Sequence, residues 1–504
     1  MNFTSKYKSK QKTVILLNSP SYEVKKSFKK VFKKSRNKIW EIRFKERTSR
    51  NVKIQDGQVN AWALINQGIR GNFSSEEAPL TLWCPNLEKA LSKERDIAIQ
   101  MMDRIDPSKT LNYQKRLMLF RYLICYWQRF LVNHNLELFF SQSIPHEVVD
   151  YVLYSLCKIK NKKTLILNYT WLPGRYFLQK DFQSPIIFYH NNRTINISND
   201  IQDELKKIKE SYEKSRPRFL SEISRQNKPF NFQYSTIEVL KRCIYPYKKV
   251  FKIRNLFLLH YKKNIGKKQL LDKIQESNWL HNLEDFSRTG KLIERLASKQ
   301  IPTCPFVYFC LNYQPEMTTS PMGGVFTDLF LAVALISHHI PKNWIVAVKE
   351  HPGQYLEYGS YNYIGRHKDY YRPYAGLSNV RFVSNELPHY ELVDRSQCVA
   401  SVNGTVGWQS LVRGKPVMVF GESWYRSAPG AYSVHDKTSC QKAVARIIKN
   451  PHLKETQLLQ WLTAFLKLCS NEFYLTKEDA AEWEQPFESQ KTIRELCRYI
   501  KKHI

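Results

Sequence analysis

Short apolar runs alternate with helix-like segments throughout the second half of the chain. The runs are Phe306–Leu311, Trp344–Val348, Val380–Val383, Cys398–Val402 and Val417–Phe420. Strands separated by helices are typical of parallel α/β sheets, because parallel neighbours need a long crossover connection. In open sheets of this kind, ligands bind at the carboxyl ends of the strands. This half therefore predicts a ligand-binding α/β domain.

A second α/β pattern lies in the first half of the chain. Thr13–Leu17 predicts a first strand, and Leu136–Phe140 and Thr164–Leu167 predict two more, with a helix at Val148–Lys158 between them. This strand, turn, helix and strand form one unit of a parallel, doubly wound sheet. A basic helix is also predicted at Ser27–Lys38. The first half therefore predicts a second doubly wound sheet.

The 504 residues are too many for one hydrophobic core, so several domains are expected. Residues 199–300 are rich in Lys and Glu and poor in strand signals, which favours a helical insertion between two α/β domains. We predict four parts, namely an N-terminal α/β domain at 1–198, the insertion at 199–300, a C-terminal α/β domain at 301–480 and a basic C-terminal helix at 481–504.

The formal net charge of +34 predicts attraction to polyanions. Nucleotide-activated or phosphorylated substrates, anionic lipid headgroups and nucleic acid all fit this charge. The chain lacks a zinc-finger pattern, an RNA-binding aromatic motif and a helix-turn-helix signature, so we expect no nucleic-acid partner. Most of this charge is expected simply to solvate the surface, and the rest makes an anionic membrane a candidate partner.

The cysteines and the apolar runs indicate the compartment. Ten cysteines are scattered without Cys-x-x-Cys spacing, which predicts reduced thiols rather than disulfides or a zinc site. No apolar run approaches the length of a membrane span, and Val14–Leu17 is too short for a signal peptide. We expect a cytoplasmic protein. The helix predicted at Lys491–His503 either packs across the domain junction or contacts the inner face of the membrane.

Polar motifs follow three of the predicted strands in the second half. Lys349, Glu350 and His351 follow one strand, and a histidine and a lysine there could bind a phosphate or protonate a leaving oxygen. A surface turn with incidental charges is the alternative. Gln314 and Glu316 follow another strand, and Glu316 could bind sugar hydroxyls or act as a base. Glu316 could equally serve as a structural hydrogen-bond acceptor.

The third motif joins a strand to a helix and consists of small residues. A helix start with glycines lets an anion approach backbone amides and the positive end of the helix dipole. The alternative is an ordinary strand-to-helix turn with Thr405 as its N-cap. The residues concerned are Ser401, Asn403, Gly404, Thr405 and Gly407.

These motifs, in this order, resemble the bacterial capsule polysaccharide biosynthesis proteins, including the Kdo transferases of capsule and surface-glycan assembly. The matching stretches are Leu311–Glu316, Ser320–Gly324, Val348–Pro352 and Asn403–Gly421, with weaker matches at Ser143–Asp150 and Leu172–Arg175. Where the family has a glutamate after the Gly-Trp pair, this chain has Gln409. Asp328-Leu329 stands where the family often has Asp-Gln.

The resemblance implies a GT-B architecture, in which two Rossmann-like domains face a cleft. It places the nucleotide-sugar donor on the C-terminal domain and the acceptor on the N-terminal one. It also implies metal-independent transfer, no cofactor beyond the nucleotide-sugar substrate, and contact between His351 and the donor phosphate. The expected donor-binding residues are Gln314, Lys349, Glu350, His351, Ser401, Asn403, Gly404, Thr405, Gly407 and Gln409.

We therefore expect a glycosyltransferase that moves a sugar, with CMP-Kdo as one candidate donor, to a growing glycan or glycolipid acceptor. Other polysaccharide assembly proteins are candidate partners. A base across the cleft would deprotonate the acceptor, and the candidates are Glu316, His146, Glu147 and Asp150. The last two open a helix, where acidic residues are favoured in any case. The alternatives are a teichoic-acid-type polyol-phosphate transferase and a non-catalytic basic scaffold that binds glycans or membranes.

Overall fold

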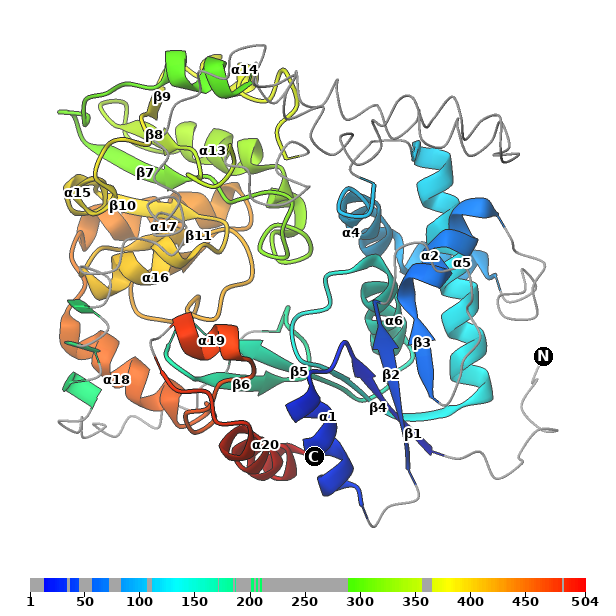
Figure 1. Ribbon diagram of the computed structural model, residues 1–504. Helices are drawn as coiled ribbons and strands as arrows, with labels where there is room; N and C mark the ends of the chain where they lie inside the picture. The colour runs from blue at the N-terminus through cyan, green and yellow to red at the C-terminus, as the bar shows by residue number, and fades with distance from the viewer. Residues whose placement is uncertain are drawn as a thin grey trace, which may run out of the picture.

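The computed structural model contains two α/β domains, each built on a six-stranded sheet (Figure 1). The predicted architecture of two doubly wound domains is confirmed. The predicted insertion at 199–300 lies mostly outside the described residues. The structure describes residues 13–33, 37–44, 57–71, 83–106, 111–170, 172–184, 186, 201–203, 205–206, 209–210, 289–355, 365–482 and 485–504.

The N-terminal sheet has the strand order β3-β2-β1-β4-β5-β6. Only β6 runs antiparallel to its neighbour. The chain order reverses between β1 and β4, and the loops that leave this point are the usual ligand site of such sheets. The strands are β1 (Thr13–Asn18), β2 (Lys38–Arg43), β3 (Gln58–Asn60), β4 (Asn135–Ser141), β5 (Thr164–Tyr169) and β6 (Tyr176–Gln179).

Helices cover both faces of this sheet. The side chains of β1 alternate between two cores, with Val14 and Leu16 on one face and Ile15 and Leu17 on the other. The helices are α1 (Tyr22–Val31), α2 (Ala61–Arg70), α3 (Pro85–Ala90), α4 (Ser92–Met101), α5 (Tyr113–Asn133) and α6 (Val148–Ile159).

The predicted basic helix at Ser27–Lys38 has the wrong bounds. Ser21 caps α1 by accepting a hydrogen bond from the Val24 amide at 3.3 Å, so the helix begins at Tyr22. Lys38 instead begins β2, which pairs in parallel with β1. The charged residues that favour a helix in isolation therefore lie partly in a strand, because pairing with β1 decides the local structure.

The C-terminal sheet is fully parallel and has the order β12-β11-β10-β7-β8-β9. Counted from β7, this is the same order as in the N-terminal sheet, with its switch point between β7 and β10. The five predicted strands are confirmed, and β12 was not predicted. The strands are β7 (Phe306–Cys310), β8 (Ile345–Lys349), β9 (Val380–Val383), β10 (Cys398–Ser401), β11 (Val417–Val419) and β12 (Ala431–Ser433).

Helices connect the first five of these strands or follow β12, and they pack on both sides of the sheet. They are η3 (Gly324–Thr327), α13 (Leu329–Ser337), α14 (Arg372–Ala375), α15 (His389–Arg395), α16 (Thr405–Val412), α17 (Lys437–Lys449), α18 (Glu455–Leu466) and α19 (Lys477–Glu482).

The last helix, α20 (Ser489–His503), returns to the N-terminal domain and lies beside α1 (Figure 1). Its Leu496 and Ile500 are buried in the same core as Phe28 of α1. The predicted helix is confirmed, and its apolar face is used in packing between chain segments. Within the described residues, no helix combines the length and the apolar character needed to cross a membrane.

Candidate functional site

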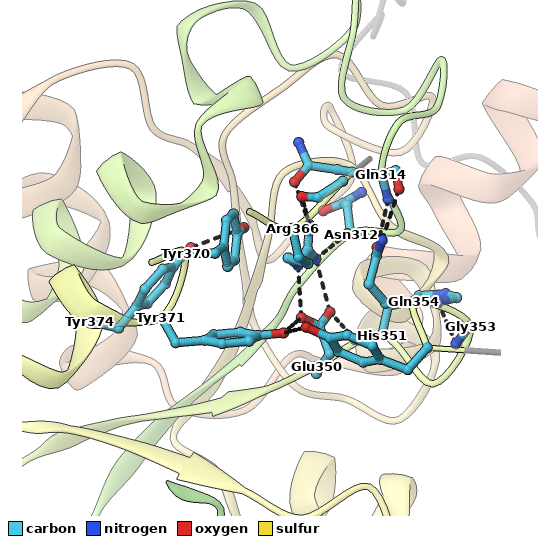
Figure 2. A network of polar contacts seen from close by, with 12 residues as sticks. Asn312, Gln314, Glu350, His351, Gly353, Gln354, Arg366, Tyr370, Tyr371 and Tyr374 are labelled. Carbon is cyan, nitrogen blue, oxygen red and sulfur yellow. Dashed lines mark hydrogen bonds and ion pairs between the residues drawn. The ribbon is translucent and has the colours of Figure 1, made fainter. Parts of the chain in front are cut away.

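A buried ion pair lies at the carboxyl end of β8 (Figure 2). Glu350, which is 2% exposed, accepts hydrogen bonds from Arg366 Nε at 2.8 Å and Nη2 at 2.9 Å. The Tyr371 hydroxyl also donates to Glu350. The Arg366 guanidinium is fully buried and lies 4.3 Å from the centre of the Tyr370 ring. A bidentate pair of this kind fixes the direction of both side chains.

The same arginine ties β8 to the loop that follows β7. Arg366 Nη1 donates to Gln314 Oε1 at 2.6 Å, and Nη2 donates to the Asn312 carbonyl at 3.0 Å. Gln314 also exchanges two backbone-to-side-chain hydrogen bonds with Gln354, at 3.0 and 2.9 Å. Gln314 and Glu350 were both expected to bind the donor, but their polar atoms are hydrogen-bonded to other residues of the protein. The network holds the two loops on either side of His351.

His351 has a defined tautomer. Its Nδ1 accepts a hydrogen bond from the Gly353 amide at 3.0 Å, so Nδ1 carries no proton. Burial lowers the pKa of His351 to about 4, and the charge of Glu350 only partly opposes this effect. The neutral ring therefore carries its proton on Nε2, which makes this atom a hydrogen-bond donor. The amide of His351 is itself bound to Glu350 at 2.6 Å, which fixes the backbone from which the ring projects.

Lys349 is the last residue of β8 and directly precedes Glu350 and His351. Its Nζ donates to the Leu387 carbonyl at 2.6 Å. Burial lowers the pKa of Lys349 to about 8. The side chain therefore stays mostly cationic near neutral pH, and its charge acts on His389.

The turn after β10 leads directly into α16. The Gly404 amide donates to Ser401 Oγ at 3.0 Å, and Gly404 occupies the N-cap position without a side-chain cap. The alternative interpretation, in which Thr405 caps the helix, is therefore wrong. Asn403 is held from both sides, by Asn312 at 3.1 Å and by the Glu422 carbonyl at 3.4 Å. The helix start is thus a rigid turn without a capping side chain.

Gly407 is required for packing. A Cβ atom added to Gly407 would lie 2.2 Å from the Tyr425 hydroxyl oxygen. That hydroxyl donates to the Gly404 carbonyl at 2.5 Å. Because Gly407 has no side chain, Tyr425 can pack against the turn and stabilise it. The sequence had instead suggested that a ligand approaches Gly407 closely.

Gln409 belongs to a chain of hydrogen bonds that the sequence did not reveal. His389 Nε2 lies 3.3 Å from Gln409 Oε1, and His389 Nδ1 lies 3.1 Å from the Tyr308 hydroxyl. Burial lowers the pKa of His389 to about 4, with Lys349 adding to the effect. A neutral His389 thus links β7 to α16. Its place after β9, at the same edge as Lys349, was the signal that could have identified it.

His146 of the N-terminal domain has the opposite tautomer to His351. Its Nδ1 lies 2.7 Å from the Ile144 carbonyl, and a carbonyl can only accept, so Nδ1 carries the proton. Burial lowers the pKa of His146. The neutral ring then has its lone pair on Nε2, which lies 4.0 Å from a Glu147 carboxylate oxygen. This arrangement is the one required of a general base.

The geometry does not support Asp150 as a base. Asp150 is 2% exposed and accepts hydrogen bonds from Asn18 at 2.7 Å and from the Glu147 amide at 3.0 Å. Burial, together with the charge of Glu147, raises the pKa of Asp150 to about 8. The residue closes the first turn of α6, which matches the structural alternative noted for it.

Glu316 is an exposed residue of the loop after β7, and the adjacent Met317 packs against the core of the N-terminal domain. Thr318 donates to its carboxylate at 3.4 Å. Desolvation raises the pKa of Glu316, while Thr318 and the charge of Arg104 oppose the rise. Arg104 comes from the N-terminal domain, so the structure brings Glu316 close to the loop that carries His146.

Residues from both domains also line a small pocket, which places the carboxyl ends of the two sheets opposite one another. The pocket is lined by Ile144, Asn168, Phe177, Gln179, Phe182, Ser184, Ile186, Met322, Glu422, Ser423, Trp424 and Arg426.

Among the residues that the structure describes, no group of three or more His, Cys, Asp or Glu side chains is arranged as metal ligands would be.

Comparison with protein families finds a match to part of the C-terminal domain. Residues 319–460 match the family model described as capsule polysaccharide biosynthesis protein. The predicted family resemblance is confirmed over this segment. The matched segment contains Lys349, His351, the turn after β10 and all of α16. No curated protein matches the chain.

Solved structures align with the chain only loosely. Two are KpsC transferases of Thermosulfurimonas dismutans. The beta Kdo 2,7 transferase has 9% identity and a TM-score of 0.30 over 79% of this chain and 95% of that one. The beta Kdo 2,4 transferase has 11% identity and a TM-score of 0.33, over 72% and 88%. The UDP-GlcNAc 2-epimerase from Methanocaldococcus jannaschii has 8% identity and a TM-score of 0.24, over 90% and 99%. With TM-scores below 0.5, these likenesses carry no argument about the site or the reaction.

Proposed function

We propose that this protein is a glycosyltransferase of capsule or surface polysaccharide biosynthesis. It transfers a sugar from a nucleotide donor to a glycan or glycolipid acceptor, and CMP-Kdo is the candidate donor. The match of residues 319–460 to the capsule family supports the pathway. The observation that carries the proposal is the fixed Nε2–H donor of His351, which stands at the carboxyl edge of a Rossmann-like sheet.

On the donor side, His351 Nε2–H and the first amides of α16 receive the phosphate oxygens. Lys349 adds a positive charge at the end of β8, and the start of α16 adds the positive end of its helix dipole. Glu350, Arg366 and Gln314 position these groups without touching the donor. Fixed donors aimed at a developing negative charge typically contribute about a hundredfold or more in rate. This stabilisation is proposed to operate without a metal ion.

On the acceptor side, His146 is the proposed base. Its Nε2 lone pair removes the proton of the acceptor hydroxyl as that oxygen bonds to the anomeric carbon of the sugar. The bond between the anomeric carbon and the phosphate oxygen breaks, and its electron pair stays on the phosphate. Glu316 is the second candidate, because it lies on the facing loop with a raised pKa. Glu147, beside His146, opposes the lowering of the His146 pKa and so makes the imidazole a stronger base.

The proposed location is the cytoplasm, next to the inner face of an anionic membrane and to other assembly proteins. The apolar face of α20 is buried, so contact with the membrane would be through its exposed basic side chains, Arg494, Arg498, Lys501 and Lys502. Flotation with vesicles of phosphatidylcholine and phosphatidylserine tests this contact. Binding that falls as salt rises is expected, and no binding even at low salt would refute it.

The test of function is turnover by the purified chain. Wild-type and His351→Ala proteins are incubated with CMP-, UDP- and CDP-linked donors and lipid-linked glycan acceptors, and released nucleotide and product mass are measured. Release of CMP with gain of one sugar is expected from the wild type. Transfer from a CDP-polyol would instead indicate the teichoic-acid-type reaction. Failure with every donor, with undiminished glycan production in His351→Ala cells, would indicate the scaffold.

A further inference from the structure

Arg104 joins the two domains at the site. It follows α4 in the N-terminal domain and donates through Nη2 to the His146 carbonyl of its own domain. Through Nη1 it donates at 3.0 Å to the Ser320 carbonyl in the C-terminal domain. The first carbonyl belongs to the residue proposed as the base, and the second lies four positions after Glu316. One guanidinium therefore fixes the backbone of both loops.

The surroundings of Arg104 are unusual for an arginine kept only for stability. Its Nε is buried, and it has no hydrogen-bond partner among the described residues. Such buried unpaired donors are rare in native proteins, and each one calls for an explanation. Burial lowers the pKa of Arg104, and four carboxylates oppose this effect, namely Glu147, Asp150, Asp103 and Glu316.

We propose that Arg104 is a positioning residue for the transfer step, which sets the His146 loop against the Glu316 loop across the domain boundary. This inference rests on the proposed function, because it gives Arg104 its role through the base. The rigid fork of the guanidinium suits this task, since its two N–H groups point to the two domains at a fixed angle. A lysine would keep the charge without this fork.

The charge of Arg104 has a separate effect from its geometry. Burial is the main cause of the lowered pKa of His146; Glu147 opposes it and Arg104 reinforces it. In Glu316, Arg104 opposes the rise caused by desolvation. Removing the cation therefore raises the pKa of both groups. The acidic limb of the rate profile should then move to higher pH, because the base stays protonated, and therefore inactive, up to a higher pH.

Arg426 provides a matched control. It is also an arginine of the domain boundary, and it donates to the Gln183 carbonyl of the N-terminal domain at 3.0 Å. Burial lowers the pKa of Arg426, as it does for Arg104. Arg426 lines the same pocket as Ile144 and Met322, but its hydrogen bond to Gln183 and its ion pair with Glu422 involve neither the His146 loop nor the Glu316 loop. A general effect of domain docking should therefore appear in both arginines, and a positioning effect only in Arg104.

The experiment compares wild type, Arg104→Gln, Arg104→Lys and Arg426→Gln. For Arg104→Gln we expect kcat to fall by about a hundredfold, as for a misplaced catalytic group, with little change in the donor KM. Its acidic limb should move to higher pH. Arg104→Lys should keep the wild-type limb but not the wild-type kcat. A wild-type kcat and limb in Arg104→Gln, or equal losses in Arg426→Gln, would overturn the proposal.

A second readout separates this inference from the proposed function. Hydrogen–deuterium exchange is measured on segments 143–150 and 316–323 of the same proteins. In Arg104→Gln, exchange should rise in both segments together, and in Arg426→Gln it should rise in neither. Inactive wild type with this exchange pattern would refute the transferase and keep the coupling by Arg104. Unchanged exchange would refute the coupling even in an active enzyme. If Arg104→Gln does not fold, the same comparison is made with Arg104→Lys.

Discussion

His146 and His351 are held as opposite tautomers. The Nδ1 of His146 donates to a backbone carbonyl, and the Nδ1 of His351 accepts from a backbone amide. One ring therefore offers a lone pair at Nε2 and the other offers a proton. Both assignments follow from main-chain contacts within each loop, so the two roles are set before a substrate arrives. A sugar placed between these rings would meet a base on one side and a donor on the other.

The tautomer of His146 predicts the pH dependence of the rate. His146 must be neutral to act as a base, and its pKa lies below the ordinary 6.5. The ratio kcat/KM should therefore stay high through neutral pH and fall only as the pH drops through this lowered pKa. His146→Asn should have a low rate that no longer depends on pH in this range. Stopped assays in overlapping buffers measure the profile, and an unchanged acidic limb in His146→Asn would exclude His146 as the base.

The tautomer of His351 predicts which substitutions are tolerated. His351→Ala removes the Nε2–H donor and should lower kcat by about a hundredfold or more. His351→Gln keeps an N–H donor and should retain more activity than His351→Ala. Steady-state kinetics with donor and acceptor varied separately measure both effects. Equal rates in the two variants would argue against hydrogen-bond donation by His351.

The Glu350–Arg366 pair predicts a loss of stability. Glu350→Gln leaves the fully buried Arg366 without its charge partner, and breaking a buried pair typically costs about 3–5 kcal/mol. The control is Glu391→Gln, since Glu391 pairs with Arg395 on the surface, where such pairs contribute about 0–1 kcal/mol. Urea unfolding followed by tryptophan fluorescence compares the two. Similar midpoints in both variants would contradict the structural role of the network.

The contact between Gly407 and Tyr425 predicts a steric clash. In Gly407→Ala the added methyl group would meet the Tyr425 hydroxyl, and overpacking of this kind typically costs about 1–3 kcal/mol. The same substitution in a Tyr425→Phe background should cost less, because the hydroxyl oxygen is gone, although nearby ring atoms remain. A double-mutant cycle of unfolding free energies measures the difference. Additive effects would show that the two residues are not coupled.

The pKa of Asp150 predicts how stability changes with pH. Its folded-state value of about 8 lies above the ordinary 3.8, so the folded protein holds a proton that the unfolded chain loses. This contribution is fully present below the unfolded pKa and is lost as the pH rises through about 8. Asp150→Asn should flatten that loss and should leave kcat nearly unchanged. Thermal unfolding between about pH 5 and pH 9 tests the first point, and loss of turnover would restore Asp150 as a base candidate.

The strands of the C-terminal domain could be predicted because their side chains are buried on both faces, which gives continuous apolar runs such as Val346–Val348. By contrast, β2 mixes lysine, glutamate and arginine with apolar residues, and its pairing with β1 could not be recognised locally. Long-range contacts limit sequence interpretation in the same way at the site.

The strand end that carries His351 was predictable, and the contacts around it were less so. The motif around His351 lies at the end of β8, as the sequence predicted. Glu350 pairs with Arg366, which comes from a segment without a recognised motif. A carboxylate that was expected to bind the donor therefore holds a loop instead. Arg104 was missed because its two acceptors are backbone carbonyls, which leave no trace in the sequence.

Because α20 returns to the N-terminal sheet, the N-terminal domain consists of two separate segments of the chain. The C-terminal domain is inserted between β6 and a helix that completes the core around Val24 and Phe28. During synthesis, the face of the sheet on which α1 packs stays incompletely covered until residues 489–500 have been made. The inserted domain can close around its own core earlier. The protein that begins folding at its first strand thus completes that same domain last.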